Sequence, residues 1–291
     1  MDGVAVPLIP CRQPYAWREL LGFLAPRVIE GVEEVQDSVY RRVISLNSKN
    51  ENLTGWFAAS YDEKKFALRT EVSSSLAPVL ERVIARLRRL FDVDSLPEEV
   101  ARTLGEMAEA CPGLRVPGCF DAFEMGVRAI LGQQVTVKAA HMIVTRVVSA
   151  LGEKIVTPFS ALYRVFPTPK KLLETDGDTL GRLGVVRSRQ RALHALAEFS
   201  LQGGLEPGTN AEEQIDKLKK LHGIGDWTAH YLAMRALNYP DAFPHTDSAI
   251  RAAMGNRPPN EIIKIAEQWR PWRAYAAMYL WLEHGKKSKK R

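Results

Sequence analysis

The chain of 291 residues is 46% hydrophobic and 25% charged, which is typical of a globular protein with one large core or two smaller ones. Its formal net charge of +6 is weak evidence for a nucleic-acid partner, because residues 286–291 carry five positive charges. We expect this basic tail to be solvated and disordered. The N-terminal sequence lacks an apolar run long enough for a signal peptide or a membrane span, so we expect a cytoplasmic protein without membrane contacts.

The N-terminal part of the chain predicts a small antiparallel sheet. Residues 65–72 alternate between polar and apolar side chains, which indicates a half-buried strand. Residues 39–46 and 54–60 are rich in β-branched and aromatic residues, and the NSKNEN sequence between them has a turn composition. An amphipathic helix with an arginine-rich face follows over residues 79–91. We therefore predict an α+β domain over residues 1–93.

The pattern of the remaining chain is that of successive helices interrupted by proline and glycine. Residues 94–285 are therefore predicted to form an all-α region. The strongest helical patterns cover residues 120–150, 187–201, 210–221, 228–237, 248–254 and 273–283. The three cysteines, Cys11, Cys111 and Cys119, are too few for a disulfide framework or a four-cysteine metal site, and we expect free thiols.

The segment Ile215 to Leu237, IDKLKKLHGIGDWTAHYLAMRAL, predicts two helices joined by a short hairpin. Gly223 and Gly225 would let the backbone approach a ligand closely, and Ile224 between them would pack the two helices together. The second helix, starting near Asp226, would present unpaired N–H groups and a positive dipole end, which suit a phosphate. The same spacing also occurs in ordinary tight turns, so the residues alone leave both hypotheses open.

The stretch LHGIGDWTAHYLAMR resembles the hairpin of the helix-hairpin-helix DNA glycosylase superfamily, and specifically its 3-methyladenine DNA glycosylase II branch. PYAWRELLGFLAPRVIEGVE, FEMGVRAILGQQVTVKAA, DAFPHTDSAIR and WRPWRAYAAMYLW match that branch in the same order, so the resemblance spans nearly the whole chain. It implies an all-α helix-hairpin-helix glycosylase core after the α+β domain. It also implies a monofunctional enzyme of base excision repair. Such an enzyme flips alkylated purines, including 3-methyladenine and 7-methylguanine, out of duplex DNA and hydrolyses the N-glycosidic bond.

The resemblance places the catalytic carboxylate at Asp247, a short loop after the second hairpin helix. Asp247 follows Pro244 and precedes SAIR, so it should begin a new helix whose dipole favours the ionised form. From the residues alone, Asp247 or Thr246 could instead be a plain helix cap. As a carboxylate, Asp247 would stabilise an oxocarbenium-like sugar and orient or deprotonate the attacking water.

The resemblance also implies an electron-rich pocket for the flipped base, formed by Phe23, Trp227, Tyr231 and Trp272. Trp227 and Tyr231 are four residues apart and share a helix face, and Trp272 follows Pro271 just before the last helix. Aromatic faces attract a cationic ring, which suits a methylated purine. Taken singly, each of these aromatic residues could instead belong to the core.

Further contacts to DNA are expected from the AILGQQV stretch. Gln133 and Gln134 lie where the family inserts a side chain into the minor groove, and Gln134 is the better match, although relatives often have an apolar wedge there. Arg251 could bind a phosphate or pair with a carboxylate. The expected partner is double-stranded DNA containing alkylated bases, bound by a monomer. No cofactor or catalytic metal is expected, and a monovalent cation at the hairpin backbone is left open.

Two other functions compete with this one. A non-catalytic helix-hairpin-helix protein would bind DNA without needing Asp247 or the aromatic set. A glycosylase for another damaged base, such as oxidised guanine, would need specific hydrogen-bonding groups and usually a lysine that forms a Schiff base with the sugar. Trp227 stands at the matching position, so we expect no lyase activity. The iron–sulfur branch is excluded because no cysteine follows Cys119.

Overall fold

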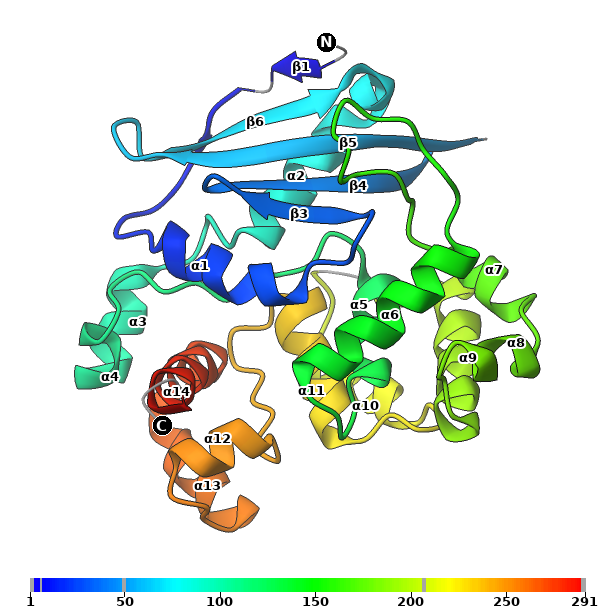
Figure 1. The fold of residues 1–291 in the computed structure, drawn as a ribbon. Helices are drawn as coiled ribbons and strands as arrows, with labels where there is room; N and C mark the ends of the chain where they lie inside the picture. Colours follow the sequence, from blue (N-terminus) through cyan, green and yellow to red (C-terminus); the bar gives the residue numbers. More distant parts are fainter. Residues whose placement is uncertain (1–2, 6, 49–50, 206–207, 289–291) are drawn as a thin grey trace.

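The computed structural model describes residues 3–5, 7–48, 51–205 and 208–288. One layer is an antiparallel sheet in the order β1-β6-β5-β4-β3, in which β2 also pairs with β6 (Figure 1). The strands are β1 (Gly3–Ala5), β2 (Ile9–Pro10), β3 (Glu33–Gln36), β4 (Val39–Ser48), β5 (Glu51–Asp62) and β6 (Ala67–Ser73). The three predicted strands are confirmed as β4, β5 and β6.

The helices from α3 onward gather on the other side of the molecule (Figure 1). The first helices are α1 (Trp17–Leu24), α2 (Leu80–Leu90), α3 (Pro97–Leu104), α4 (Glu106–Glu109), α5 (Ala122–Leu131), α6 (Val137–Leu151) and α7 (Pro169–Leu173). The others are α8 (Gly177–Arg182), α9 (Arg187–Leu201), α10 (Ala211–Lys219), α11 (Asp226–Ala236), α12 (Ser248–Ala253), α13 (Pro259–Ala266) and α14 (Arg273–Ser288). The predicted fold class, a sheet-containing domain followed by a helical region, is confirmed.

The single helix predicted over residues 120–150 is wrong, because the structure has two helices there. α5 ends at Leu131, and Thr136 caps α6 by accepting a hydrogen bond from the Ala139 N–H at 3.2 Å. Between them Gln134 has a φ of 55°, in the left-handed region that interrupts a helix. The apolar pattern continues across this turn, so periodicity could not reveal the break.

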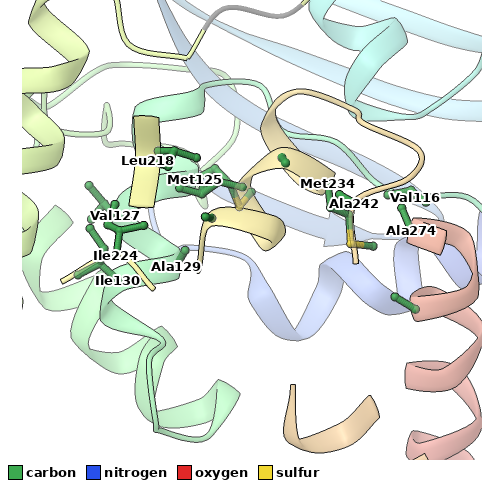
Figure 2. Packing of buried hydrophobic residues seen from close by; sticks show 14 of the residues in the cluster. Val116, Met125, Val127, Ala129, Ile130, Leu218, Ile224, Met234, Ala242 and Ala274 are labelled. Carbon is green, nitrogen blue, oxygen red and sulfur yellow. The ribbon is translucent and has the colours of Figure 1, made fainter. Parts of the chain in front are cut away.

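The molecule has two main hydrophobic cores, and each of them includes residues from both sides of the predicted domain boundary near residue 93. The sheet and α2 share one core, which also includes Phe120. The helical core includes Ile29 and Val32 from the N-terminal part. Figure 2 shows part of the helical core, where buried residues of α5 pack near Ile224 of the hairpin. The domain boundary itself stays a prediction.

The basic tail begins later than the sequence suggests. Helix α14 continues through Ser288, so Lys286 and Lys287 are helical, and the ammonium of Lys287 lies 2.5 Å from a carboxylate oxygen of Glu283. This i,i+4 pair offsets the repulsion between neighbouring lysines. Residues 289–291 of the predicted tail lie outside the described residues. Within the described ranges, no helix is both long and apolar enough to cross a membrane.

Candidate active site

A cavity of about 1150 Å³ opens between α1, the turn joining α5 to α6, the hairpin before α11, and the start of α12. This cavity brings together residues that are far apart in the sequence. The predicted site residues that line it are Phe23, Gln133, Gln134, Gly223, Gly225, Trp227, Tyr231 and Asp247. Ile224, Arg251 and Trp272 do not line it.

Asp247 is half-buried and directly precedes α12. Its Oδ1 accepts hydrogen bonds from the backbone N–H groups of Ala249, at 2.9 Å, and Ile250, at 3.1 Å, so Asp247 caps this helix as the sequence allowed. Two indoles also donate to it: Nε1 of Trp227 lies 2.9 Å from Oδ2, and Nε1 of Trp281 lies 3.0 Å from Oδ1. A cap alone would not need the indole donors. They fix the carboxylate in one orientation at the cavity wall.

Four aromatic rings line the same cavity as the Asp247 carboxylate. Trp227 and Tyr231 stack with their centroids 5.1 Å apart and their planes within 10°, as expected from their i,i+4 spacing on α11. The ring of Trp281 lies 6.2 Å from Tyr231 and 6.1 Å from Phe23, measured between centroids. Helices α1, α11 and α14 thus each supply part of one aromatic wall.

The hairpin between α10 and α11 has the features that a backbone phosphate site needs. Gly223 has a φ of 77°, and an added Cβ would lie 2.7 Å from Cβ of Ala192 on α9, so only glycine fits. Ile224 is 4% exposed and packs in the helical core, as predicted. Gly225 directly precedes α11 and offers no side-chain cap to the N–H groups of its first turn. Those groups are left for water or an anion.

Two family models cover most of the chain. Residues 8–121 match the AlkA N-terminal domain, and residues 127–257 match the HhH-GPD superfamily base excision DNA repair protein. DNA-3-methyladenine glycosylase 2 of Escherichia coli (strain K12) is 39% identical over 275 residues, which cover 94% of this chain and 95% of that protein. The chain belongs to the DNA-3-methyladenine glycosylase II family.

One further relative agrees with this family, and one solved structure shares the fold. The probable bifunctional transcriptional activator/DNA repair enzyme AlkA of Mycobacterium tuberculosis (strain CDC 1551 / Oshkosh) is 35% identical over 95% of this chain, which spans only 57% of that protein. The solved structure of a 3-methyladenine DNA-glycosylase from Archaeoglobus fulgidus superposes with a TM-score of 0.79 at 20% identity, covering 98% of both chains. At that identity the superposition supports the fold alone.

In this member of the glycosylase family, the prediction that Trp272 lines the pocket is wrong. Trp272 lies just before α14, outside the cavity, and makes a T-shaped contact with Tyr275 at 5.6 Å between centroids. Helix α14, which contacts α12, carries the pocket tryptophan midway along its length, so Trp281 reaches Asp247 instead. Trp281 shares a helix face with the buried Ala274, but residues 274–280 are all buried, so helical periodicity alone does not single out Trp281.

The turn between α5 and α6 forms one edge of the cavity. Nε2 of Gln133 donates to the Gly223 carbonyl and to Oγ1 of Thr228, both at 2.9 Å, so Gln133 ties this turn to the hairpin. Gln134 is exposed, as the wedge prediction requires. The neighbouring Val135 also lines the cavity and is exposed, although the sequence had not singled it out.

Arg251 lies on the exposed side of α12. Among the described residues no carboxylate pairs with its guanidinium, so its pairing with a carboxylate has no support in the structure. Its contact with a DNA phosphate stays a prediction.

Arg27, Arg235 and Cys119 line the cavity without having been predicted to do so. Arg235 on α11 is 2% exposed, and its guanidinium donates to the Tyr231 hydroxyl at 2.7 Å and to two backbone carbonyls. Burial raises the pKa of Cys119 to about 12, so its thiol is neutral near pH 7 and is a poor nucleophile. No sequence signal separates these residues from ordinary surface arginines or a core cysteine.

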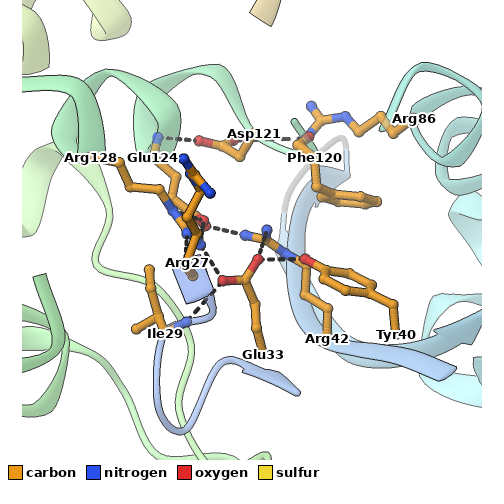
Figure 3. A network of polar contacts seen from close by, with 10 residues as sticks. All are labelled: Arg27, Ile29, Glu33, Tyr40, Arg42, Arg86, Phe120, Asp121, Glu124 and Arg128. Atoms are coloured by element: carbon orange, nitrogen blue, oxygen red, sulfur yellow. Dashed lines mark hydrogen bonds and ion pairs between the residues drawn. The ribbon is translucent and has the colours of Figure 1, made fainter. Parts of the chain in front are cut away.

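A buried ion network of Glu33, Arg42, Glu124 and Arg128 joins the sheet to α5 (Figure 3), and all of these residues except Glu124 line the cavity. Arg42 Nη1 lies 2.8 Å from Glu33, Arg128 Nη2 lies 2.5 Å from Glu124, and each arginine also pairs with the other glutamate. Burial alone would raise the pKa of Glu33, but Arg128 and Arg42 hold it at about 2. Arg128 Nη1 also donates to the Arg27 backbone carbonyl at 2.7 Å, so the network fixes the chain where it borders the cavity.

Proposed function

We propose that this chain is a monofunctional DNA glycosylase that removes alkylated purines, such as 3-methyladenine and 7-methylguanine, from duplex DNA in base excision repair. The main support is the position of Asp247, a carboxylate oriented by two indole N–H groups inside an aromatic cavity beside the hairpin. Family membership supports the same activity. We also propose that the protein acts as a monomer and in the cytoplasm.

The positive charge of an alkylated base explains why cleavage of the glycosidic bond needs only one catalytic carboxylate. Methylation at N3 of adenine or N7 of guanine makes the base cationic and therefore a good leaving group, so strong general-acid help is unnecessary. As the glycosidic bond breaks, positive charge develops on the sugar, and the preoriented Asp247 carboxylate stabilises it. The same group orients or deprotonates the attacking water.

The target nucleotide must leave the helical stack before this chemistry, at a cost of a few kcal/mol. The cavity of about 1150 Å³ exceeds the roughly 300–1,000 Å³ of ordinary ligand sites and therefore has room for a purine nucleotide. Gln134 at its edge is our candidate for the side chain that fills the gap left in the duplex. The described cavity wall contains no lysine, which supports hydrolysis without a Schiff base.

The purified protein should release 3-methyladenine and 7-methylguanine from methylated duplex DNA and leave an uncut abasic strand. Chromatography of the free bases and a denaturing gel before and after alkali measure the two steps. Binding without any base release would favour the non-catalytic alternative. Strand cleavage by the protein alone would contradict the monofunctional assignment.

Affinity for undamaged duplex should fall steeply with salt, because the hairpin backbone and nearby cations contact phosphates. Each neutralised phosphate contributes roughly −0.9 to the slope of log affinity against log salt. Gly223→Ala should weaken binding and reduce this slope by about one such contact, since the added Cβ collides with Ala192. Fluorescence anisotropy over a salt series measures both quantities.

The matched control is Gly255→Ala, because Gly255 has a similar φ of 73° but open space around its Cα. It carries the same backbone strain without a collision, so the slope should stay unchanged. A flat salt response of the unsubstituted protein would contradict docking through the hairpin. Removing residues 289–291 from the unsubstituted protein and from Gly223→Ala measures how much of the salt slope comes from the basic end of the chain.

A further inference from the structure

Two guanidinium groups lie against the aromatic walls of the cavity. Cζ of Arg27 is 3.9 Å from the ring centroid of Phe23, and Cζ of Arg235 is 4.9 Å from that ring and 5.5 Å from the ring of Tyr231. All three distances are within the range of cation–π attraction. The faces of Phe23 and Tyr231 therefore already interact with cations of the protein itself.

The charges around the cavity do not simply favour a cationic base. The buried ion network contains two carboxylates and two guanidinium groups, so it contributes no net charge. With neutral histidines, the nearby charges that remain are Asp247 against Arg27 and Arg235, an excess of one positive charge. Among the described residues, no arginine or lysine lies over Trp227 or Trp281, the two rings that contact Asp247.

Arg235 and Arg27 differ in how many of their guanidinium N–H groups already donate hydrogen bonds within the protein. The Arg235 guanidinium is buried and donates to three acceptors of the protein. Arg27 is half-buried, donates from Nη1 to the Phe23 carbonyl at 2.7 Å, and interacts with the Tyr231 hydroxyl. A guanidinium has five N–H groups, so Arg27 keeps donors for a ligand in the cavity that it lines. Burial lowers the pKa of Arg27, because its guanidinium loses hydrogen bonds to water. A hydrogen-bond acceptor on the ligand would replace those lost bonds.

We propose that Arg27 is a specificity-determining residue of the pocket, whose guanidinium donates a hydrogen bond to the ring-carbonyl oxygen of a flipped neutral oxopurine such as hypoxanthine. A cationic base without that oxygen, such as 3-methyladenine, is held instead between the indoles of Trp227 and Trp281 next to Asp247. The pocket therefore accepts two chemical classes of base through different groups. This inference rests on the proposed glycosylase function.

The competing explanation is structural. Arg27 follows α1, and its bond to the Phe23 carbonyl could serve only to cap the end of that helix. A cap affects the stability of the pocket wall and hence every substrate equally. A donor to the base affects oxopurines selectively. The ratio of rates on two substrates therefore separates the two roles.

The test uses Arg27→Met, which keeps an unbranched side chain but removes the charge and the donors. Single-turnover release of hypoxanthine and of 3-methyladenine is measured, and each rate is divided by that of the unsubstituted protein. Hypoxanthine release should fall about tenfold or more, the loss expected for one hydrogen bond from a charged donor. Release of 3-methyladenine should fall by a smaller factor, because that base accepts no hydrogen bond from Arg27, so the ratio of the two rates is the readout.

Equal changes on the two substrates would overturn the proposal and leave Arg27 as a helix cap. Release of 3-methyladenine also reports whether the variant folds, and Arg27→Lys serves as the second variant if it does not. Lysine keeps the charge but loses the planar fork, so hypoxanthine release should again fall selectively. Failure of the proposed function is a separate outcome, in which the unsubstituted protein releases neither base.

Discussion

Asp247→Asn should lower single-turnover base release at least about 100-fold, the range found when a preorganised electrostatic group is removed from an active site. The amide keeps the shape of the side chain but cannot balance the positive charge that develops on the sugar. Its NH₂ group must also face one of the two indole donors, since Trp227 and Trp281 bond to different oxygens of Asp247. DNA binding should persist, because the hairpin is unchanged.

A matched control separates the charge of Asp247 from its orientation. Trp227→Phe keeps an aromatic wall but removes the N–H donor to Oδ2 of Asp247. Its loss should be about tenfold, the value of one hydrogen bond to a charged group. Rates are compared with enzyme in excess, so that slow product release does not hide the chemical step. Full activity of Asp247→Asn would remove Asp247 from the mechanism.

Periodicity predicted the parts of this molecule in which one face of an element is buried. Strand β6, the hairpin helices and the shared face of Trp227 and Tyr231 follow from spacing along the chain, whereas β4 and β5 follow from their β-branched and aromatic composition. The cap at Asp247 follows from its place before a new helix. These features depend on neighbours in sequence, which is why a single sequence reveals them.

The remaining features depend on contacts between distant segments. Arg42 lies in a strand where its charge suggests an exposed face, yet it is 4% exposed because Glu33 and Glu124 neutralise it. Arg235 likewise occupies a helical position typical of the surface but is buried against backbone carbonyls. Burial of such charges requires partners that no local pattern specifies. The error over Trp272 has a related cause, since only the approach of α14 to α12 selects Trp281.

Trp281→Ala should reduce release of cationic 3-methyladenine more than release of neutral hypoxanthine. Both substrates lose a stacking surface and the indole donor to Oδ1 of Asp247, so both rates fall. Only the cationic base also loses cation–π attraction, which is worth on the order of 0.5–2 kcal/mol, or about 2- to 30-fold in rate. Single-turnover release of the two bases from each protein measures this differential loss.

Trp272→Ala is the matched control, because it removes the same side chain from the same segment of the chain but outside the cavity. Trp272 contacts Tyr275 and packs against the helical core, so its loss should lower the free energy of unfolding and leave the ratio of the two rates unchanged. If both variants shifted the ratio, the effect would come from the stability of α14 and not from the pocket.

If Trp281→Ala reduced both rates equally, the indole would contribute only a stacking surface for the base and a hydrogen-bond donor to Asp247. Selection of charged bases would then need another source, and the excess positive charge from Arg27 and Arg235 argues against a simple Coulombic one.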